Sequence, residues 1–153
     1  MEQRTKTIVL LFFVFLFIGI FFWYREQQPV EKEYAFPSPE DVVRLYFTAW
    51  DDKQYPDMYS TIADDFKRSE PTAHNLSAFR SYVEQQHVTQ IILADLQQIS
   101  NDGMLANVTY DIRLARDDTI VPLQGTFVLG NKQADIIRGW KLIHPYGENE
   151  DTS

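Results

Sequence analysis

Apolar and polar residues alternate strictly along residues 104–115 and predict one long β-strand. Every second position is apolar, at Met104, Ala106, Val108, Tyr110, Ile112 and Leu114. Successive side chains of a strand point to opposite faces, so one face of this strand is expected to be dry and the other mostly wet. A strand of this kind belongs in an antiparallel sheet whose dry face is covered by other elements.

Turn-forming residues divide the second half of the chain into four expected strands. These strands are Thr89–Ile99, Met104–Ala115, Ile120–Leu129 and Ile136–Pro145. The expected turns between them are Asn101-Asp102-Gly103, Arg116-Asp117-Asp118 and Gly130-Asn131-Lys132. Gly103 suits the first turn because glycine adopts positive φ without steric cost. Short turns of this composition predict a meander of antiparallel strands.

A helical periodicity precedes the strands. The first helix is expected to start at Ser38, with Pro39 at its first position and Asp41 spaced to complete a capping box. Its apolar positions follow helical spacing and comprise Val43, Tyr46, Phe47 and Trp50, widened by Val42, Leu45 and Ala49. We interpret this aromatic stripe as core packing, with the lining of a ligand cavity as the alternative.

Two shorter helical segments follow the first. The second has its apolar face at Tyr55, Met58 or Tyr59, Ile62 and Phe66, and the third begins near Asn75 with Leu76, Phe79, Tyr82 and Val83 inside. The adjacent Asp64 and Asp65 are interpreted as a solvated helix end rather than a paired-carboxylate site. Three helices followed by a meander predict an α+β fold, with the helices against one face of a curved antiparallel sheet.

Several segments resemble one known family. Residues 36–67, which include FTAWDDKQYPDMYSTIADDF, resemble the opening helices of a nuclear transport factor 2-like domain. The segments VTYDI at 108–112, GTFVL at 125–129 and GWKL at 139–142 are similar to one branch of it. That branch is the N-terminal, non-catalytic domain of low-affinity class B penicillin-binding proteins of Gram-positive bacteria. The resemblance covers residues 36–147 and implies a cystatin-like cone of three helices on a curved sheet.

The transpeptidase of those penicillin-binding proteins is not expected here. A serine transpeptidase uses Ser-x-x-Lys, Ser-x-Asn and Lys-Thr-Gly elements, and none of the three occurs in the sequence. The resemblance therefore implies the fold and an extracytoplasmic compartment, without the catalytic activity.

An uncharged apolar run, Ile8–Tyr24, stands near the N-terminus. A helix of this run would span about 25 Å, at the short end for crossing a bilayer. A retained anchor is favoured over a cleaved signal peptide because the run ends in bulky aromatic residues. Arg4 and Lys6 precede the run and place the N-terminus in the cytoplasm. The expected organisation is a cytoplasmic tail (1–6), a transmembrane anchor (7–24), a linker (25–36), an extracytoplasmic domain (37–147) and an acidic disordered tail (148–153).

Charge and composition exclude several classes of function. The net charge of −8 disfavours a nucleic-acid partner, because an acidic protein repels phosphate backbones. Cysteine is absent, which removes disulfides, thiol catalysis and thiolate metal sites. His74 and His87 lack the spacing of zinc ligands. No cofactor and no metal ion are therefore expected.

Three residues form the sharpest catalytic hypothesis that the sequence offers. Asp95 would orient His144 as a general base, with the Tyr110 hydroxyl on the dry face of the strand between them. The favoured interpretation is different: an aspartate at the rim, a tyrosine in the core and a histidine at a strand end. No catalytic residue is then assigned.

Two functions stay open at this point. The favoured one is a non-catalytic module, tethered to the cytoplasmic membrane by residues 7–24, that binds an envelope protein or positions a cell-wall enzyme; homodimerisation stays open. The alternative is a cone that binds a small ligand or acts as a hydrolase or isomerase. A cavity with converging polar groups would favour the alternative, and a cone packed shut by aromatic side chains would favour the first.

Overall fold

The computed structural model describes residues 36–146 of the 153-residue chain. The helices are α2 (Pro39–Asp51), α3 (Tyr55–Ser60), α4 (Asp64–Ser69) and α5 (Leu76–Glu84). The strands are β1 (Val88–Asn101), β2 (Leu105–Arg116), β3 (Thr119–Lys132) and β4 (Gly139–Leu142). Within this range no helix is long and apolar enough to span a bilayer. The expected cytoplasmic tail, anchor and acidic tail, and the linker up to residue 35, lie outside the described residues.

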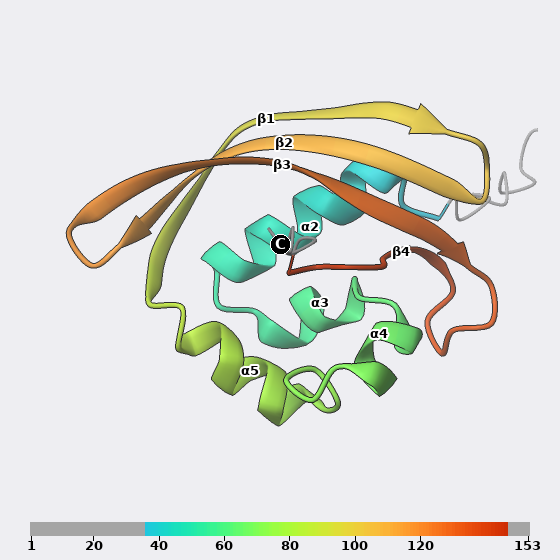
Figure 1. Cartoon of the computed structure of the whole chain (residues 1–153), viewed down its shortest axis with the longest axis horizontal. Coiled ribbons are helices and arrows are strands. Elements are labelled where there is room, and N and C mark those ends of the chain that lie inside the picture. Colours follow the sequence, from blue (N-terminus) through green and yellow to red (C-terminus); the bar gives the residue numbers. More distant parts are fainter. Residues whose placement is uncertain (1–35, 147–153) are drawn as a thin grey trace, which may run out of the picture. The chain divides into compact units, whose positions relative to one another are not determined.

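The strands form one antiparallel sheet in the order β1-β2-β3-β4. The sheet curves over α2, and the other helices lie on the same side of it (Figure 1). This arrangement confirms the expected α+β class, with helices against one face of a curved antiparallel sheet. We call the face toward the helices concave and the other face convex.

A capping box starts α2 as the sequence predicts. The Ser38 hydroxyl oxygen accepts a hydrogen bond from the Asp41 backbone N–H, and the Asp41 carboxylate accepts from the Ser38 N–H. Val43, Tyr46 and Phe47 are buried. The prediction is wrong at Leu45, of which 42% is exposed.

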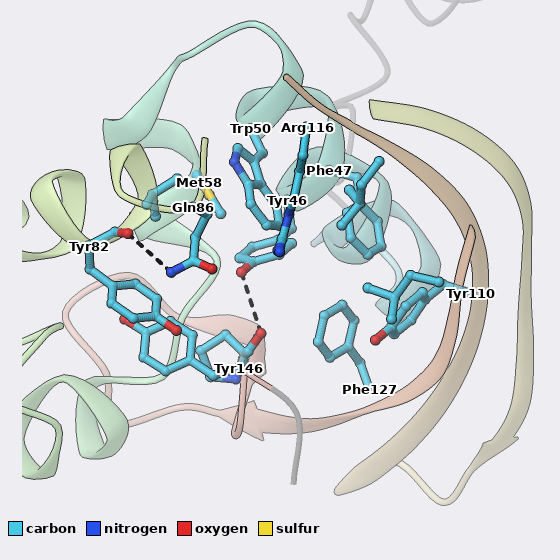
Figure 2. A pocket seen from close by; sticks show the side chains of 14 residues that line it. Tyr46, Phe47, Trp50, Met58, Tyr82, Gln86, Tyr110, Arg116, Phe127 and Tyr146 are labelled. Atoms are coloured by element: carbon cyan, nitrogen blue, oxygen red, sulfur yellow. Dashed lines mark hydrogen bonds between the residues drawn. The ribbon is translucent and has the colours of Figure 1, made fainter. Parts of the chain in front are cut away.

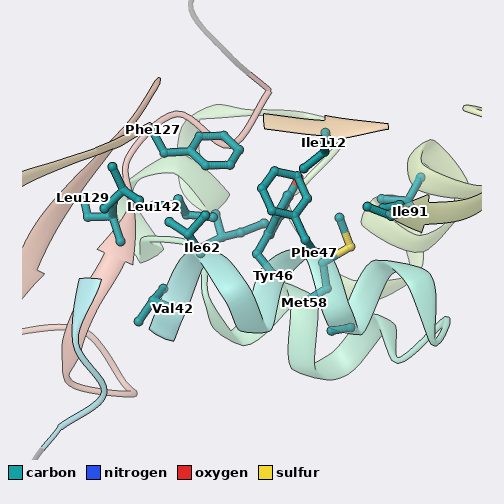
Figure 3. Packing of buried hydrophobic residues seen from close by; sticks show 14 of the residues in the cluster. Val42, Tyr46, Phe47, Met58, Ile62, Ile91, Ile112, Phe127, Leu129 and Leu142 are labelled. Atoms are coloured by element: carbon teal, nitrogen blue, oxygen red, sulfur yellow. The ribbon is translucent and has the colours of Figure 1, made fainter. Parts of the chain in front are cut away.

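The alternation along β2 corresponds to its two faces. Ala106, Val108, Ile112 and Leu114 are buried on the concave face. Figure 3 shows Ile112 and Phe127 on the sheet side of the core, facing Phe47 of α2. The prediction is wrong at Met104, which precedes the strand and is 70% exposed.

The third turn and the last strand differ from the prediction. Asn131 pairs with Trp140 inside the sheet, so Gly130-Asn131-Lys132 belongs to β3 and the connection is 133–138. The last strand begins only at Gly139, and Ile136 is 93% exposed. This connection is bound to the start of α4 instead of to the sheet. The Asp135 carboxylate accepts from the Asp64 N–H at 2.9 Å.

The Asp64 side chain completes that contact. Its carboxylate accepts from the Ile136 N–H at 2.8 Å and forms an ion pair with Lys67. The expectation of a solvated helix end is therefore wrong at Asp64, which is half-buried, and correct at Asp65, whose side chain is 62% exposed.

The second apolar segment forms two helices, so residues 36–146 contain four helices where three were expected. Ile62, between α3 and α4, forms a parallel bridge with Leu142 of β4. The Leu142 N–H donates to the Thr61 carbonyl, and the Ala63 N–H donates to the Leu142 carbonyl. This pairing uses backbone groups that a continuous helix would need, so the helix is interrupted there.

Candidate ligand cavity

A cavity of about 160 Å³ lies between α2, α5 and the concave face of β2 and β3 (Figure 2). Its lining is mainly aromatic and aliphatic. The lining residues are Tyr46, Phe47, Trp50, Met58, Tyr82, Val83, Gln86, Tyr110, Leu114, Arg116, Leu123, Phe127, Pro145 and Tyr146. The aromatic stripe of α2 therefore has both functions that the sequence left open, because it packs in the core and lines the cavity.

Mutual ring contacts hold the aromatic wall in place. Tyr110 lies between Phe47 and Phe127, with ring centroids 5.1 and 4.7 Å away. On the other side, Tyr82 and Tyr146 are tilted against each other at 4.4 Å. Rings packed in this way lose little further freedom when a ligand binds, so the wall is pre-organised.

The tyrosine hydroxyls of this wall stay protonated at neutral pH. The Tyr46 hydroxyl donates to the Pro145 carbonyl at 3.4 Å, and burial strongly raises the pKa of Tyr46. Burial also raises the pKa of Tyr110, and it raises that of Tyr146 to about 12. None of these groups is a base near neutral pH, and the residues lining the cavity include no carboxylate, histidine or thiol.

Arg116 supplies the positive charge among the lining residues. It is the last residue of β2, its side chain is exposed, and in Figure 2 it extends inward over the cavity. No ion pair joins it to a carboxylate within residues 36–146. Gln86 adds a side-chain amide, whose nitrogen donates to the Tyr82 carbonyl at 3.5 Å.

The sequence interpretation missed Arg116. Arg116 follows Ile112 and Leu114 at intervals of two residues, and both of these are buried. This spacing could have placed Arg116 on the same face of the strand. The composition of Arg116-Asp117-Asp118 indicated a turn and concealed that signal. In the structure the turn is confined to Asp117 and Asp118, with Asp117 at a φ of 49°.

The structure does not bring Asp95, Tyr110 and His144 together. Asp95 is opposite Asp111 in the ladder, whereas its neighbour Leu96 is opposite Tyr110. Asp95 therefore lies on the convex face and Tyr110 on the concave face. His144 follows β4, is exposed, and has its ring edge-on to Phe66 at 6.3 Å.

Asp95 lines a different feature, a shallow open groove on the convex face. Tyr110 lines both this groove and the aromatic cavity, and Thr109, Asp111 and Gln124 also line the groove. The Gln124 amide donates to the Asp111 carboxylate at 2.8 Å. In the part of the chain from Phe36 to Tyr146, no three acidic or histidine side chains converge on one point as metal ligands would. The groove therefore offers hydrogen-bonding groups and negative charge, without the geometry of a metal centre.

Comparisons with known proteins show similarity in fold and none in sequence family. No protein-family model matches the chain, and no curated protein matches it. The structure is similar to a SEC-C motif containing protein from Psychrobacter arcticus, with a TM-score of 0.51 and 10% identity over 79% of this chain. The chain spans 64% of the length of that protein. This similarity shows a shared fold.

Two solved structures of lower similarity are about the size of the domain. One is a proposed dehydratase of the NTF2-like (nuclear transport factor 2-like) family from Streptomyces avermitilis, with 15% identity and a TM-score of 0.44, covering 66% of this chain and 86% of its own. The other is a proposed polyketide cyclase from Pseudomonas putida, with 15% identity and a TM-score of 0.45, covering 69% and 86%. The dehydratase is described as a member of the family that the sequence resembles. For this chain the resemblance to penicillin-binding proteins stays a prediction.

Proposed function

We propose that this chain is a non-catalytic binding module and that the aromatic cavity is its ligand site, which is the ligand-binding form of the alternative that the sequence left open. The observation that supports this proposal is the cavity itself, with its packed aromatic wall and a single cationic side chain at one end. Small-molecule sites in proteins are concave and mostly apolar, with a few polar groups that orient the ligand.

The chemistry of the lining favours binding over catalysis. General acid–base catalysis needs a group whose pKa lies near the working pH. The phenols of Tyr46, Tyr110 and Tyr146 have raised pKa values, and the guanidinium of Arg116 offers hydrogen-bond donors and no acceptor. These groups can bind and orient a ligand, but they cannot exchange protons with it readily at neutral pH.

The size of the cavity limits the ligand to a small one. A cavity of about 150 Å³ holds one benzene molecule. The 160 Å³ measured here therefore fits a single six-membered ring or a body of similar volume. Larger ligands would have to project out of the cavity.

Binding in the cavity can be tested with benzyl alcohol as a neutral probe. We expect the probe to raise the melting temperature of the full chain, because a ligand that binds only the folded state stabilises it. Leu123 lines the cavity and is 41% exposed, so Leu123→Trp should fill the cavity and abolish the shift.

Ile120→Trp is the matched control. Ile120 is 63% exposed on the convex face of the same strand, and the shift should survive there. No shift with the unmodified chain, or an equal shift with both variants, would argue against the cavity as the site.

We further propose that residues 7–24 hold this module on the outer side of the cytoplasmic membrane, beside an envelope protein partner. The support is the uncharged run Ile8–Tyr24 with Arg4 and Lys6 before it. Tethering raises the local concentration of the domain, so weak contacts with a membrane neighbour suffice. A cell-wall enzyme is one such neighbour, as the resemblance to penicillin-binding proteins suggests.

Protease accessibility tests this topology. Protease added to cells stripped of their wall should digest residues 37–153 and spare the anchor. A protected domain, or a mature N-terminus that begins after Tyr24, would overturn this topology.

Binding to the envelope partner should weaken with salt, because the net charge of −8 favours a basic surface on that partner.

A further inference from the structure

We propose that the ligand of the cavity is a small aromatic monocarboxylate whose ring lies against the aromatic wall and whose carboxylate pairs with Arg116. This inference rests on the proposed binding function and names the ligand class of the same site. It follows from the position of Arg116, from its lack of a described ion-pair partner and from the polarity of the surrounding lining.

The strand register fixes the side of the sheet on which Arg116 lies. Along β2, Ile112 and Leu114 are buried on the concave face, and Arg116 is the next residue of that series. Its partner across the β1 ladder is Val88, which is also buried. The strand register thus directs the Cα–Cβ bond of Arg116 toward the side of the sheet on which the helices lie.

The charge of Arg116 acts inside the cavity. Burial and the charge of Glu70 raise the pKa of Tyr82, and the positive charge of Arg116 acts against them. Tyr82 is on α5 and lines the same cavity as Arg116. The effect of Glu70 on this phenol is larger than that of Arg116, so a ligand group would meet the positive charge next to the Arg116 guanidinium and not beside Tyr82.

The carboxylates nearest to Arg116 in the chain do not neutralise it. Asp117 and Asp118 form the following turn, are exposed, and have no ion pair with Arg116. A guanidinium presents parallel N–H donors that match the two oxygens of a carboxylate. A ligand carboxylate would thus find a bidentate partner in Arg116 that the described part of the protein leaves available.

The other lining residues determine which ligand body and which ligand charge fit the cavity. Apart from Arg116 and the Gln86 amide, the polar atoms of the lining side chains are tyrosine hydroxyls and the Trp50 indole N–H, so the body of the ligand should be apolar and flat. Among the lining residues Arg116 is the single cation, and Glu70 contributes negative potential near Tyr82 and Tyr146. One cation matches one negative charge, whereas the second charge of a phosphate dianion would have no cationic partner among the lining residues.

Benzoate and benzyl alcohol form the test pair, because they share the ring and differ in charge. With the full chain we expect benzoate to bind roughly ten times more tightly or better, since a charge-assisted bidentate hydrogen bond discriminates by that order. In the Arg116→Gln variant this preference for benzoate over benzyl alcohol should disappear. Arg116→Lys should retain part of it, because the charge stays and the paired geometry is lost.

Arg113→Gln is the matched control, since it removes the same charge from the convex face of the same strand. It should leave the preference intact. Equal affinity for both probes, or a preference that survives Arg116→Gln, would overturn the carboxylate assignment while leaving the binding function in place. If neither probe binds, the proposed function fails and the inference fails with it.

Discussion

The ring of Tyr110 covers Gly125, the residue directly opposite it on β3. A Cβ atom at Gly125 would lie 2.5 Å from the Tyr110 hydroxyl oxygen and 2.7 Å from the ring carbon that carries it. The glycine therefore gives the tyrosine space to lie flat along the sheet, between Phe47 and Phe127, instead of standing up into the cavity. The volume of the ligand site depends on this pair.

Gly125→Ala should displace the Tyr110 ring. We expect an unfolding free energy lower by about 1–3 kcal/mol, the usual cost of overpacking, together with weaker binding of benzyl alcohol. Chemical denaturation and a probe titration measure the two effects.

The displacement can be isolated with a double-mutant cycle. In a Tyr110→Val background the crowding is absent, so Gly125→Ala should be neutral or stabilising by up to about 1 kcal/mol. Equal costs in both backgrounds would mean that the tyrosine is not the reason for the glycine.

The two faces of the sheet should respond differently to the same polar side chain. Val108 is fully buried, so Val108→Asn buries an amide without partners and should cost about 3 kcal/mol or more. Thr126→Asn places the amide on the exposed convex face and should cost under about 1 kcal/mol. Thermal unfolding of the two variants compares them, and equal losses would contradict the assignment of the faces.

The capping box of α2 should make stability depend on acid pH. Hydrogen bonds from the Ser38 side chain and backbone lower the pKa of Asp41 below its usual 3.8. The contribution of these hydrogen bonds to the unfolding free energy is thus present above the unfolded pKa of Asp41, and it is lost as the pH falls through the lower pKa of the folded state. Ser38→Ala should cost about 1 kcal/mol at pH 7, and its difference from the unmodified chain should narrow in acid.

Ser77→Ala provides the comparison for the cap. Ser77 is exposed in the first turn of α5, where Asn75 is the capping residue. We expect this variant to be neutral at every pH, and an equal loss in both serine variants would exclude the cap as the cause.

Tyr146 should make the domain less stable in alkali. Burial raises its folded pKa to about 12, while the unfolded side chain ionises near 10. The contribution of Tyr146 to the unfolding free energy is therefore fully present below the unfolded pKa, and it is lost as the pH rises from there through the folded pKa. Tyr146→Phe should flatten the pH dependence of the unfolding free energy between the two pKa values, and an unchanged slope would contradict this role.

Local patterns predicted much of the fold. The side-chain period of a strand and the burial of one face are both properties of neighbouring residues, so the alternation of β2 gave its two faces correctly from Ala106 to Leu114. The capping box from Ser38 to Asp41 spans one helical turn and is equally local. For the same reason the α+β class was predictable before any contact was known.

Contacts between distant segments decided the elements that the sequence did not predict. The pairing of Ile62 with Leu142 interrupts the second helix, and the bonds between Asp64 and the 133–138 connection delay the last strand to Gly139. A β-bulge at Ala94 shifts the register between Leu93 and Asp95, so Ile91 and Leu93 lie on the concave face before it, and Leu96 and Gln98 lie there after it. That shift puts Asp95 on the convex face and separates it from Tyr110.

The cavity itself is a product of tertiary structure. In the sequence, each wall of the cavity is visible only as an apolar helix face or an alternating strand. These patterns predict which residues are buried, but they do not predict where the packing leaves a cavity. The alternation along β2 already placed Arg116 on the same face as Ile112 and Leu114. Only the curvature of the sheet over α2 and α5 turns that position into a positive charge facing an aromatic wall, because opposing surfaces come together when the whole chain has folded.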